Sequence, residues 1–213
     1  PLLRAETIER MRAEKVARGV DLLILSALEP LPGRIVRDAS GRVTRIVEVT
    51  DATPDELRIQ EGNTGTYLVD AEFLWKVDDK NAQGEIYLTD IVAIAVRDGR
   101  AIDAVPTGDA DEALGINSRA ELARASAVLR RRTAQRVMDE GVTLIDPDAT
   151  YLDWGVQIGR DTVIEPGCVI QGRTRIGERC TIKAHTVVES SEIGDDVVLG
   201  PSAHLRPGNR LGT

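Results

Sequence analysis

Aromatic residues are scarce in this chain of 213 residues: they make up only 3% of it, whereas hydrophobic residues make up 42%. A core built from this composition must be mostly aliphatic. Positive charge is also in short supply, because 27 lysines and arginines face 35 acidic residues and leave a net charge of −8. A protein that binds nucleic acid usually presents a basic face. We therefore expect no nucleic-acid partner.

Long apolar runs are absent as well. Crossing a bilayer takes about 20 consecutive apolar residues, and no segment of the sequence approaches that length or resembles a signal peptide. We therefore expect no membrane partner. The chain opens at Pro1 inside a helical pattern and stops at Thr213 inside a repeat. Both ends look cut, so we expect a fragment of a longer protein.

A six-residue repeat dominates the last third of the sequence. Every sixth residue from Ile158 to Val188 is aliphatic, and after a slip of one residue the repeat resumes from Ile193 to Leu211. A period of six fits neither a helix nor an alternating strand. It is typical of a parallel β-helix, in which three hexads close one triangular coil. We expect the aliphatic side chains to point into this prism and to stack on equivalents eighteen residues later.

Cysteine and histidine are too few to build a metal centre or a disulfide framework. The two cysteines, Cys168 and Cys180, occupy the small inward position of two hexads and stand twelve residues apart. That spacing places them on different faces of the prism, so we expect two free, buried thiols and, from them, a cytoplasmic protein. Zinc enzymes built on a β-helix need three converging histidines. This chain has only His185 and His204, which we expect at the surface.

The first half of the chain alternates helical and extended patterns, which indicates an α/β domain. Capping boxes at 53–56 and 118–121 mark the starts of two helices. We expect an α/β domain over 1–117, a linker helix over 118–141 with an apolar stripe at Leu122, Leu129 and Val137, and a β-helix over 142–213. Within the first domain we expect helices at 4–18 and 84–98, strands at 21–28, 63–70 and 102–106, and a hairpin at 33–37 and 42–48.

Seven short motifs follow one another in a recognisable order. They are 33–38 (GRIVRD), 46–48 with 51–53 (IVE, DAT), 63–65 (NTG), 81–85 (NAQGE), 87–90 (YLTD), 115–119 (GINSR) and 203–208 (AHLRPG). Together they resemble the bacterial family of bifunctional UDP-N-acetylglucosamine pyrophosphorylases/glucosamine-1-phosphate N-acetyltransferases, over essentially the whole chain. The resemblance implies the C-terminal half of a Rossmann-like nucleotidyltransferase domain, then a helix and about three coils of a left-handed β-helix.

The resemblance also implies binding residues. Gly33, Glu48, Asn63 and Asn117 match positions that bind UDP-N-acetylglucosamine, and Asn117 also matches a Mg²⁺ ligand. Arg206 matches an arginine that holds substrate phosphate in the acetyltransferase site. The chain departs from the family pattern at two places. Residues 31–32 are Leu-Pro where the family usually has Gly-Tyr, and residue 62 is glycine where the family usually has an apolar residue.

The implied reactions are acetyl transfer from acetyl-CoA to glucosamine-1-phosphate and uridyl transfer from UTP to the acetylated sugar phosphate, with Mg²⁺ and in a homotrimer. The family's glycine-rich UTP loop and its catalytic histidine are both missing from the sequence. We therefore assign no catalytic residue and expect the chain alone to be inactive. Two alternatives stay open: another sugar-1-phosphate nucleotidyltransferase with a hexapeptide tail, or a non-catalytic trimerising module.

Overall fold

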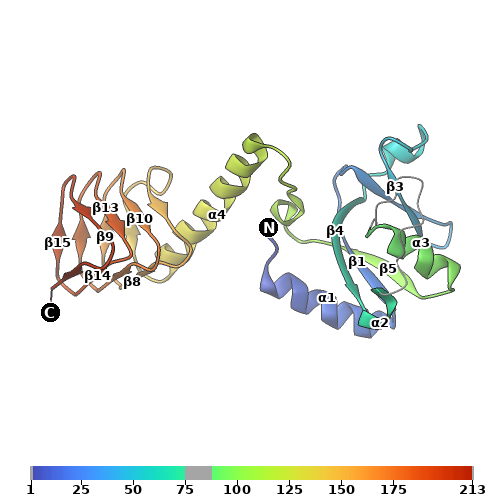
Figure 1. Ribbon diagram of the computed structural model, residues 1–213, viewed down its shortest axis with the longest axis horizontal. Helices are drawn as coiled ribbons and strands as arrows, with labels where there is room; N and C mark the ends of the chain where they lie inside the picture. Colours follow the sequence, from blue (N-terminus) through green and yellow to red (C-terminus); the bar gives the residue numbers. More distant parts are fainter. Residues whose placement is uncertain (1, 75–87, 213) are drawn as a thin grey trace. The chain divides into compact units, whose positions relative to one another are not determined.

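A computed structural model describes residues 2–74 and 88–212 of the chain. It consists of two compact units, Pro1–Asn117 and Ser118–Thr213 (Figure 1). The first unit is a mixed α/β structure and the second is a β-helix with one long helix before it, so the predicted fold classes are confirmed. No helix in the described part of the chain is both long and apolar enough to cross a membrane.

The first unit is built on a five-stranded mixed sheet with the order β3-β2-β4-β1-β5, in which β1 and β5 are parallel. The strand bounds are β1 Leu22–Ala27, β2 Gly33–Arg37, β3 Val43–Glu48, β4 Gly62–Val69 and β5 Ile102–Pro106. The helices are α1 Ala5–Arg18, α2 Ala71–Leu74 and α3 Asp90–Arg97, with 3₁₀ turns η1 Glu56–Arg58 and η2 Ala110–Ala113.

Strand β1 lies at the centre of this unit, and all six of its residues are buried. Leu22 and Ile24 pack in the cluster that contains the apolar face of α3. Leu23 and Leu25 pack in a second cluster, together with Met11 of α1. A strand that is covered on both faces reads as a continuous apolar run, which explains why this segment shows no alternation.

The helix predicted over 84–98 is shorter in the structure. Helix α3 begins at Asp90, and Leu88, which was assigned to its apolar face, lies before it with 49% of its surface exposed. Ile91, Val92 and Ala95 do form the buried face. Residues 84–87, together with the motifs at 81–85 and the start of 87–90, lie outside the described residues.

The second unit is a prism of three parallel sheets, each with four strands, so it has four coils where the sequence predicted about three. The predicted stacking is confirmed: Ile158 pairs with Ile176, and Ile176 pairs with Ile193 after the slip of one residue. The strands are β6 Thr143–Leu144, β7 Tyr151–Leu152, β8 Gln157–Ile158, β9 Val163–Ile164, β10 Val169–Gln171, β11 Arg175–Ile176, β12 Thr181–Ile182, β13 Val187–Glu189, β14 Glu192–Ile193, β15 Val198–Leu199, β16 His204–Leu205 and β17 Arg210–Leu211.

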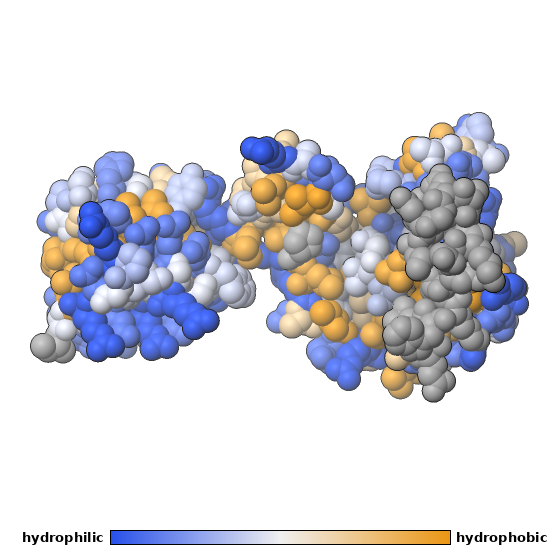
Figure 2. All heavy atoms as spheres, viewed as in Figure 1, coloured by the Kyte–Doolittle hydropathy of each residue, from blue (hydrophilic) through white to orange (hydrophobic). Residues whose placement is uncertain are grey.

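The two cysteines at small inward positions of the prism are buried as predicted. Cys168 and Cys180 are free thiols with 0% and 1% of their surface exposed. Burial is the main reason that the pKa of Cys168 is raised. Most aliphatic and small residues point inward, and the face of the prism that is visible in Figure 2 carries mainly hydrophilic residues with some hydrophobic ones between them.

Helix α4, Arg119–Asp139, precedes the prism and begins at the predicted cap, where the Glu121 N–H donates to Ser118 Oγ at 3.2 Å. The predicted apolar stripe was mostly wrong, because Leu122 is 52% exposed and Leu129 is 40% exposed. The buried residues of the helix are smaller ones: Ala125, Val128, Thr133, Ala134 and Val137. Ala134 and Val137 belong to the same apolar cluster as the interior of the prism.

Candidate functional site

Three predicted sugar-binding residues meet on neighbouring strands of the first unit. Gly33 opens β2 and pairs with Glu48 at the end of β3, while Asn63 lies on β4, on the other side of β2. A Cβ atom on Gly33 would lie 3.2 Å from Glu48 Oε1 and 3.3 Å from the Cβ of Asn63. At these distances the neighbouring side chains would have to move by a few tenths of an ångström to admit a Cβ atom. The absence of a side chain at residue 33 therefore lets the Glu48 and Asn63 side chains approach each other.

Tyr67 belongs to the same group and was not predicted from the sequence. The Asn63 side chain donates from Nδ2 to the Tyr67 hydroxyl at 2.8 Å and accepts at Oδ1 from the Gly65 N–H at 3.0 Å. Burial raises the pKa of Tyr67, and the nearby negative charge of Glu48 acts in the same direction. Simple alternation along the strand gave no signal for this contact, because the pairing of β4 with β1 shifts register between Thr66 and Asn63.

The group that these four residues form, called here the Glu48 cluster, offers hydrogen-bonding groups of two kinds. Glu48 is exposed and presents carboxylate oxygens, which accept hydrogen bonds. Asn63 has a second amide N–H that is not used in its bond to Tyr67. The orientation of the amide is fixed because both its nitrogen and its oxygen are hydrogen-bonded. A fixed donor beside an exposed carboxylate matches the alternating donors and acceptors of sugar hydroxyl groups.

The two departures from the family pattern are in contact with each other. A Cβ atom on Gly62 would lie 2.6 Å from the Cβ of Leu31 and 2.7 Å from its Cγ. The Leu31 side chain therefore occupies the space that an apolar residue at 62 would need. We infer that leucine at 31 and glycine at 62 compensate for each other and hold the 28–32 loop against β4, next to Asn63.

This contact predicts a strong coupling between the two positions. Gly62→Val alone should destabilise the first unit by roughly 2–3 kcal/mol, because the new side chain overlaps Leu31 and the backbone of Glu29. Leu31→Gly should remove the overlap with Leu31, so the double variant should be more stable than Gly62→Val alone. Urea unfolding of all four proteins in a double-mutant cycle measures this coupling. Additive effects of the two substitutions would show that the positions do not compensate.

Asn117 lies apart from this group in the chain, at the last position of the first unit. It is exposed, and its Nδ2 lies 3.6 Å from the place where a Cβ on Gly115 would be. The side chains that come closest to Gly33 are those of Glu48, Ile46 and Asn63, so Asn117 is not among them. Among the described residues, no three His, Cys, Asp or Glu side chains are grouped so that they could hold a metal ion.

Arg206 lies on the outside of the prism, directly after β16. Its backbone carbonyl accepts from Ser191 Oγ at 2.9 Å and from Asn209 Nδ2 at 2.6 Å, which fixes the corner. The corner continues into Gly208, whose φ of 84° is a conformation that glycine adopts at low cost. The guanidinium group is exposed, and no hydrogen bond or ion pair of it is seen within the described chain. It can therefore meet an anion at the surface.

Both histidines are exposed, as predicted. The Nε2 atom of His204 lies 3.2 Å from Oε2 of Glu189. His185 adopts a left-handed backbone conformation with φ of 59°. The ring of His185 packs over Gly167, where a Cβ atom would lie only 2.3 Å from its Nδ1.

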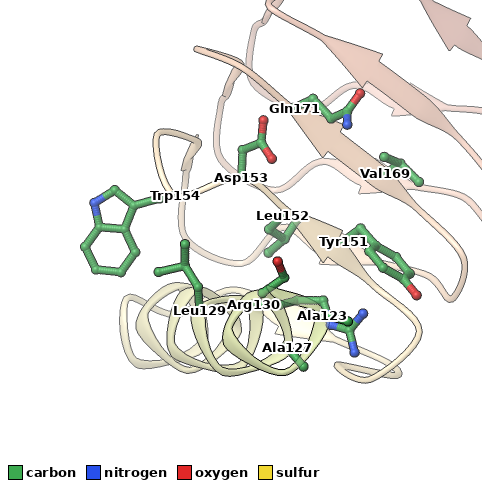
Figure 3. Close-up of a pocket in the computed structure, with 11 residues that line it drawn as sticks. Ala123, Ala127, Leu129, Arg130, Tyr151, Leu152, Asp153, Trp154, Val169 and Gln171 are labelled. Atoms are coloured by element: carbon green, nitrogen blue, oxygen red, sulfur yellow. The ribbon is translucent and has the colours of Figure 1, made fainter. Parts of the chain in front are cut away.

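A groove of about 620 Å³ runs between α4 and the first two coils of the prism. Figure 3 shows Tyr151 and Trp154 near its two ends, with Leu152 and Asp153 between them. The Arg130 guanidinium lies over the Tyr151 ring at 4.5 Å. The arginine run at 130–132 therefore includes one residue that holds the helix to the prism by a cation–π contact.

Comparison with known proteins identifies the class of the second unit first. Residues 155–190 match the family model "Bacterial transferase hexapeptide (six repeats)". The prism is therefore a hexapeptide-repeat domain of the kind found in bacterial transferases.

Curated relatives then match along nearly the whole chain. "Bifunctional protein GlmU" of Trichlorobacter lovleyi is 46% identical over 99% of this chain and 51% of the relative. The proteins of the same name from Enterococcus faecalis and Geobacter sulfurreducens are 45% and 43% identical, over 97% and 100% of this chain and 50% and 53% of theirs. The predicted resemblance is confirmed: the chain is related to the bifunctional GlmU proteins and spans about half their length.

Proposed function

We propose that this chain supplies the sugar-binding part of a uridyltransferase and the first coils of an acetyltransferase, both of which serve the synthesis of UDP-N-acetylglucosamine. The observation that carries this proposal is the meeting of Gly33, Glu48 and Asn63 on three adjacent strands. They are separated in the sequence by up to 30 residues, and the pairing of β2 with β3 and β4 brings them together. The relationship to the bifunctional GlmU proteins supports the choice of substrate.

In the proposed uridyl transfer, the residues of this chain bind and orient rather than react. Glu48 accepts hydrogen bonds from sugar hydroxyl groups, and the fixed amide of Asn63 donates to the sugar. Gly33 has no side chain of its own that would come between Glu48 and Asn63. Positioning of this kind lowers the barrier for attack of a sugar phosphate on a nucleotide phosphate, which needs no protein nucleophile.

The described residues fit Mg²⁺ only in part. Asn117 offers one amide oxygen, a suitable donor for a hard cation, while Glu112 nearby in the sequence is already bonded to Thr7 and Thr107. A single oxygen does not hold Mg²⁺, so we propose that Asn117 contributes one ligand to a site that other parts of the enzyme complete. We expect no tight Mg²⁺ binding by this chain alone.

For the second activity we propose that Arg206 binds the phosphate of glucosamine-1-phosphate, with acetyl-CoA as the acetyl donor. Arginine suits phosphate because its planar fork can make two parallel hydrogen bonds. The exposed position of Arg206 on the outer surface of the prism agrees with a site that a neighbouring subunit completes. The sequence holds neither a glycine-rich UTP loop nor the family's catalytic histidine, so we expect binding by this chain without turnover.

The chain should bind UDP-N-acetylglucosamine through the Glu48 cluster. Glu48→Gln should weaken binding about 10- to 100-fold, because a hydrogen bond to a charged group contributes roughly 1.5–3 kcal/mol. Isothermal titration calorimetry on the whole chain measures this effect. Glu9→Gln is the matched control, since Glu9 is an exposed glutamate on α1 with a single ion pair to Arg12. Equal affinity in the wild type and Glu48→Gln would remove Glu48 from the site.

The prism should assemble as a homotrimer. We propose three prisms side by side, because the proposed acetyltransferase site at Arg206 lies on the outer surface and is incomplete in one copy. Sedimentation equilibrium between micromolar and hundred-micromolar concentrations tests this expectation. A monomer at every concentration would contradict it. A trimer that binds no sugar nucleotide would favour the alternative of a non-catalytic assembly module.

A further inference from the structure

Arg34 is a buried cation without a partner in the described chain. It follows Gly33 in β2, and only 7% of its surface is exposed. Its Nε and Nη1 atoms are buried and make no hydrogen bond. Buried polar groups in folded proteins are nearly always hydrogen-bonded, and an unpaired buried charge is far more costly than an unpaired neutral group. An unsatisfied guanidinium therefore requires an explanation.

Arg37, on the same strand, is a partly buried arginine that does have hydrogen-bonding partners. Its guanidinium donates to both carboxylate oxygens of Glu61, to Asp103 and to two backbone carbonyls. These partners raise the pKa of Arg37, chiefly through the hydrogen bonds to Glu61. The contrast shows that the sheet provides acidic partners for one arginine and not for the other.

The acidic residues beside Arg34 in the sheet are directed elsewhere. Glu61, whose carbonyl accepts from the Ile35 N–H, uses both carboxylate oxygens on Arg37 and Ser26. Glu48 pairs with Gly33 in the ladder, and successive side chains of a strand point to opposite faces. The Arg34 side chain therefore lies on the face of β2 that is opposite to the Glu48 cluster.

We propose that Arg34 is an oxyanion-binding site on the face of the sheet opposite to the Glu48 cluster. The third guanidinium nitrogen, Nη2, is not among the buried unpaired atoms, so an anion can approach the group from that end. An anion at Nη2 gains one charge-assisted hydrogen bond and lies beside the positive charge that the whole guanidinium shares. The ligand is a phosphate or a carboxylate, two anionic groups that each present a pair of oxygen acceptors to a guanidinium.

The test uses inorganic phosphate and the whole chain. Adding 10 mM phosphate at pH 7, against sodium chloride of equal ionic strength, should shift the ¹⁵Nε–¹H signal of Arg34 and raise the melting temperature of the first unit by about 4 °C or more. Arg34→Met should abolish the rise and should itself melt no lower than the wild type in chloride, because it removes an unpaired buried charge. Arg58→Met, which removes a cation that is 81% exposed, should keep the full response.

Two further probes separate the possible sources of the oxyanion. If acetate matches phosphate at equal concentration, the site accepts a carboxylate as well. If UDP shifts the Arg34 signal at a concentration ten times lower than phosphate does, the source is a nucleotide. The proposal is wrong if phosphate leaves the Arg34 signal in place, or if Arg34→Met retains the phosphate response. It is equally wrong if Arg34→Met melts well below the wild type in chloride, because the guanidinium would then have a stabilising partner in the chain. None of these outcomes depends on the proposed binding of UDP-N-acetylglucosamine.

Discussion

Replacing Gly177 with alanine should unfold the prism while the first unit stays folded. A Cβ atom on Gly177 would lie 2.6 Å from the carbonyl carbon of Gly194, 2.7 Å from the Asp195 nitrogen and 2.3 Å from Asp195 Oδ1. The first two contacts are with backbone of the next coil, which the ladder bond from the Gly177 N–H to the Ile193 carbonyl holds in place. We expect a loss of ~3 kcal/mol or more in the second unit.

Gly194 is the matched control for this variant, because it stands at the same corner one coil further on. A Cβ there would meet its closest atoms at 3.5 Å, an ordinary contact distance. Gly194→Ala should therefore change stability little. Hydrogen–deuterium exchange distinguishes the units, since Gly177→Ala should accelerate exchange throughout 143–211 and leave 22–69 unchanged. Equal protection of the prism in both variants would mean that the corner can move to accommodate a side chain.

Replacing Arg37 with methionine should destabilise the first unit. Arg37 bonds Glu61 at 2.7 and 2.8 Å and Asp103 at 3.0 Å, and its side chain is only 28% exposed. Its removal takes the cation away from Glu61 and Asp103, of which Asp103 keeps an ion pair with Arg18. Breaking a fully buried pair from one side costs about 3–5 kcal/mol, and we expect about 2 kcal/mol for this partly buried network. The melting temperature of the first unit should fall by ~10 °C or more.

The control for this second variant is Arg42→Met. The Arg42 side chain is 80% exposed and pairs with Asp38 in the turn between β2 and β3. Exposed pairs of this kind contribute 1 kcal/mol or less, so the melting temperature should barely move. If the two variants had the same melting temperature, the network around Arg37 would contribute no more to the stability of the first unit than an exposed ion pair does. The opposite predictions for Arg34→Met and Arg37→Met follow from one difference, the presence of acidic partners.

The repeat of the prism could be predicted because the same position of every hexad points into the interior and is therefore aliphatic. The period itself does not extend to the first coil, where Leu144 and Leu152 are eight residues apart. The reasoning from hydrophobic pattern was wrong on α4, whose core face is made largely of alanine and valine rather than of the leucines. A stripe of small residues carries little hydrophobic signal, although it packs closely.

The candidate site could be predicted only as separate residues. The family resemblance indicated Gly33, Glu48 and Asn63, but their meeting depends on the register of β2 between β3 and β4. The bond between Asn63 and Tyr67 lies within β4, and the contact between Leu31 and Gly62 joins the 28–32 loop to β4. Both depend on the local path of the backbone and on distances of a few ångströms, which the pattern of residue types along the chain does not contain.

The measurement that tests the central claim most directly is an NMR titration of the ¹⁵N-labelled chain with UDP-N-acetylglucosamine, with uridine as the reference ligand. The claim is that Gly33, Glu48 and Asn63 form one sugar-binding surface. It predicts that the sugar nucleotide shifts the signals of Gly33, of the Asn63 side-chain amide and of residues at the end of β3, and that uridine does not. Shifts confined to other parts of the first unit, or no shift at millimolar ligand, would contradict it.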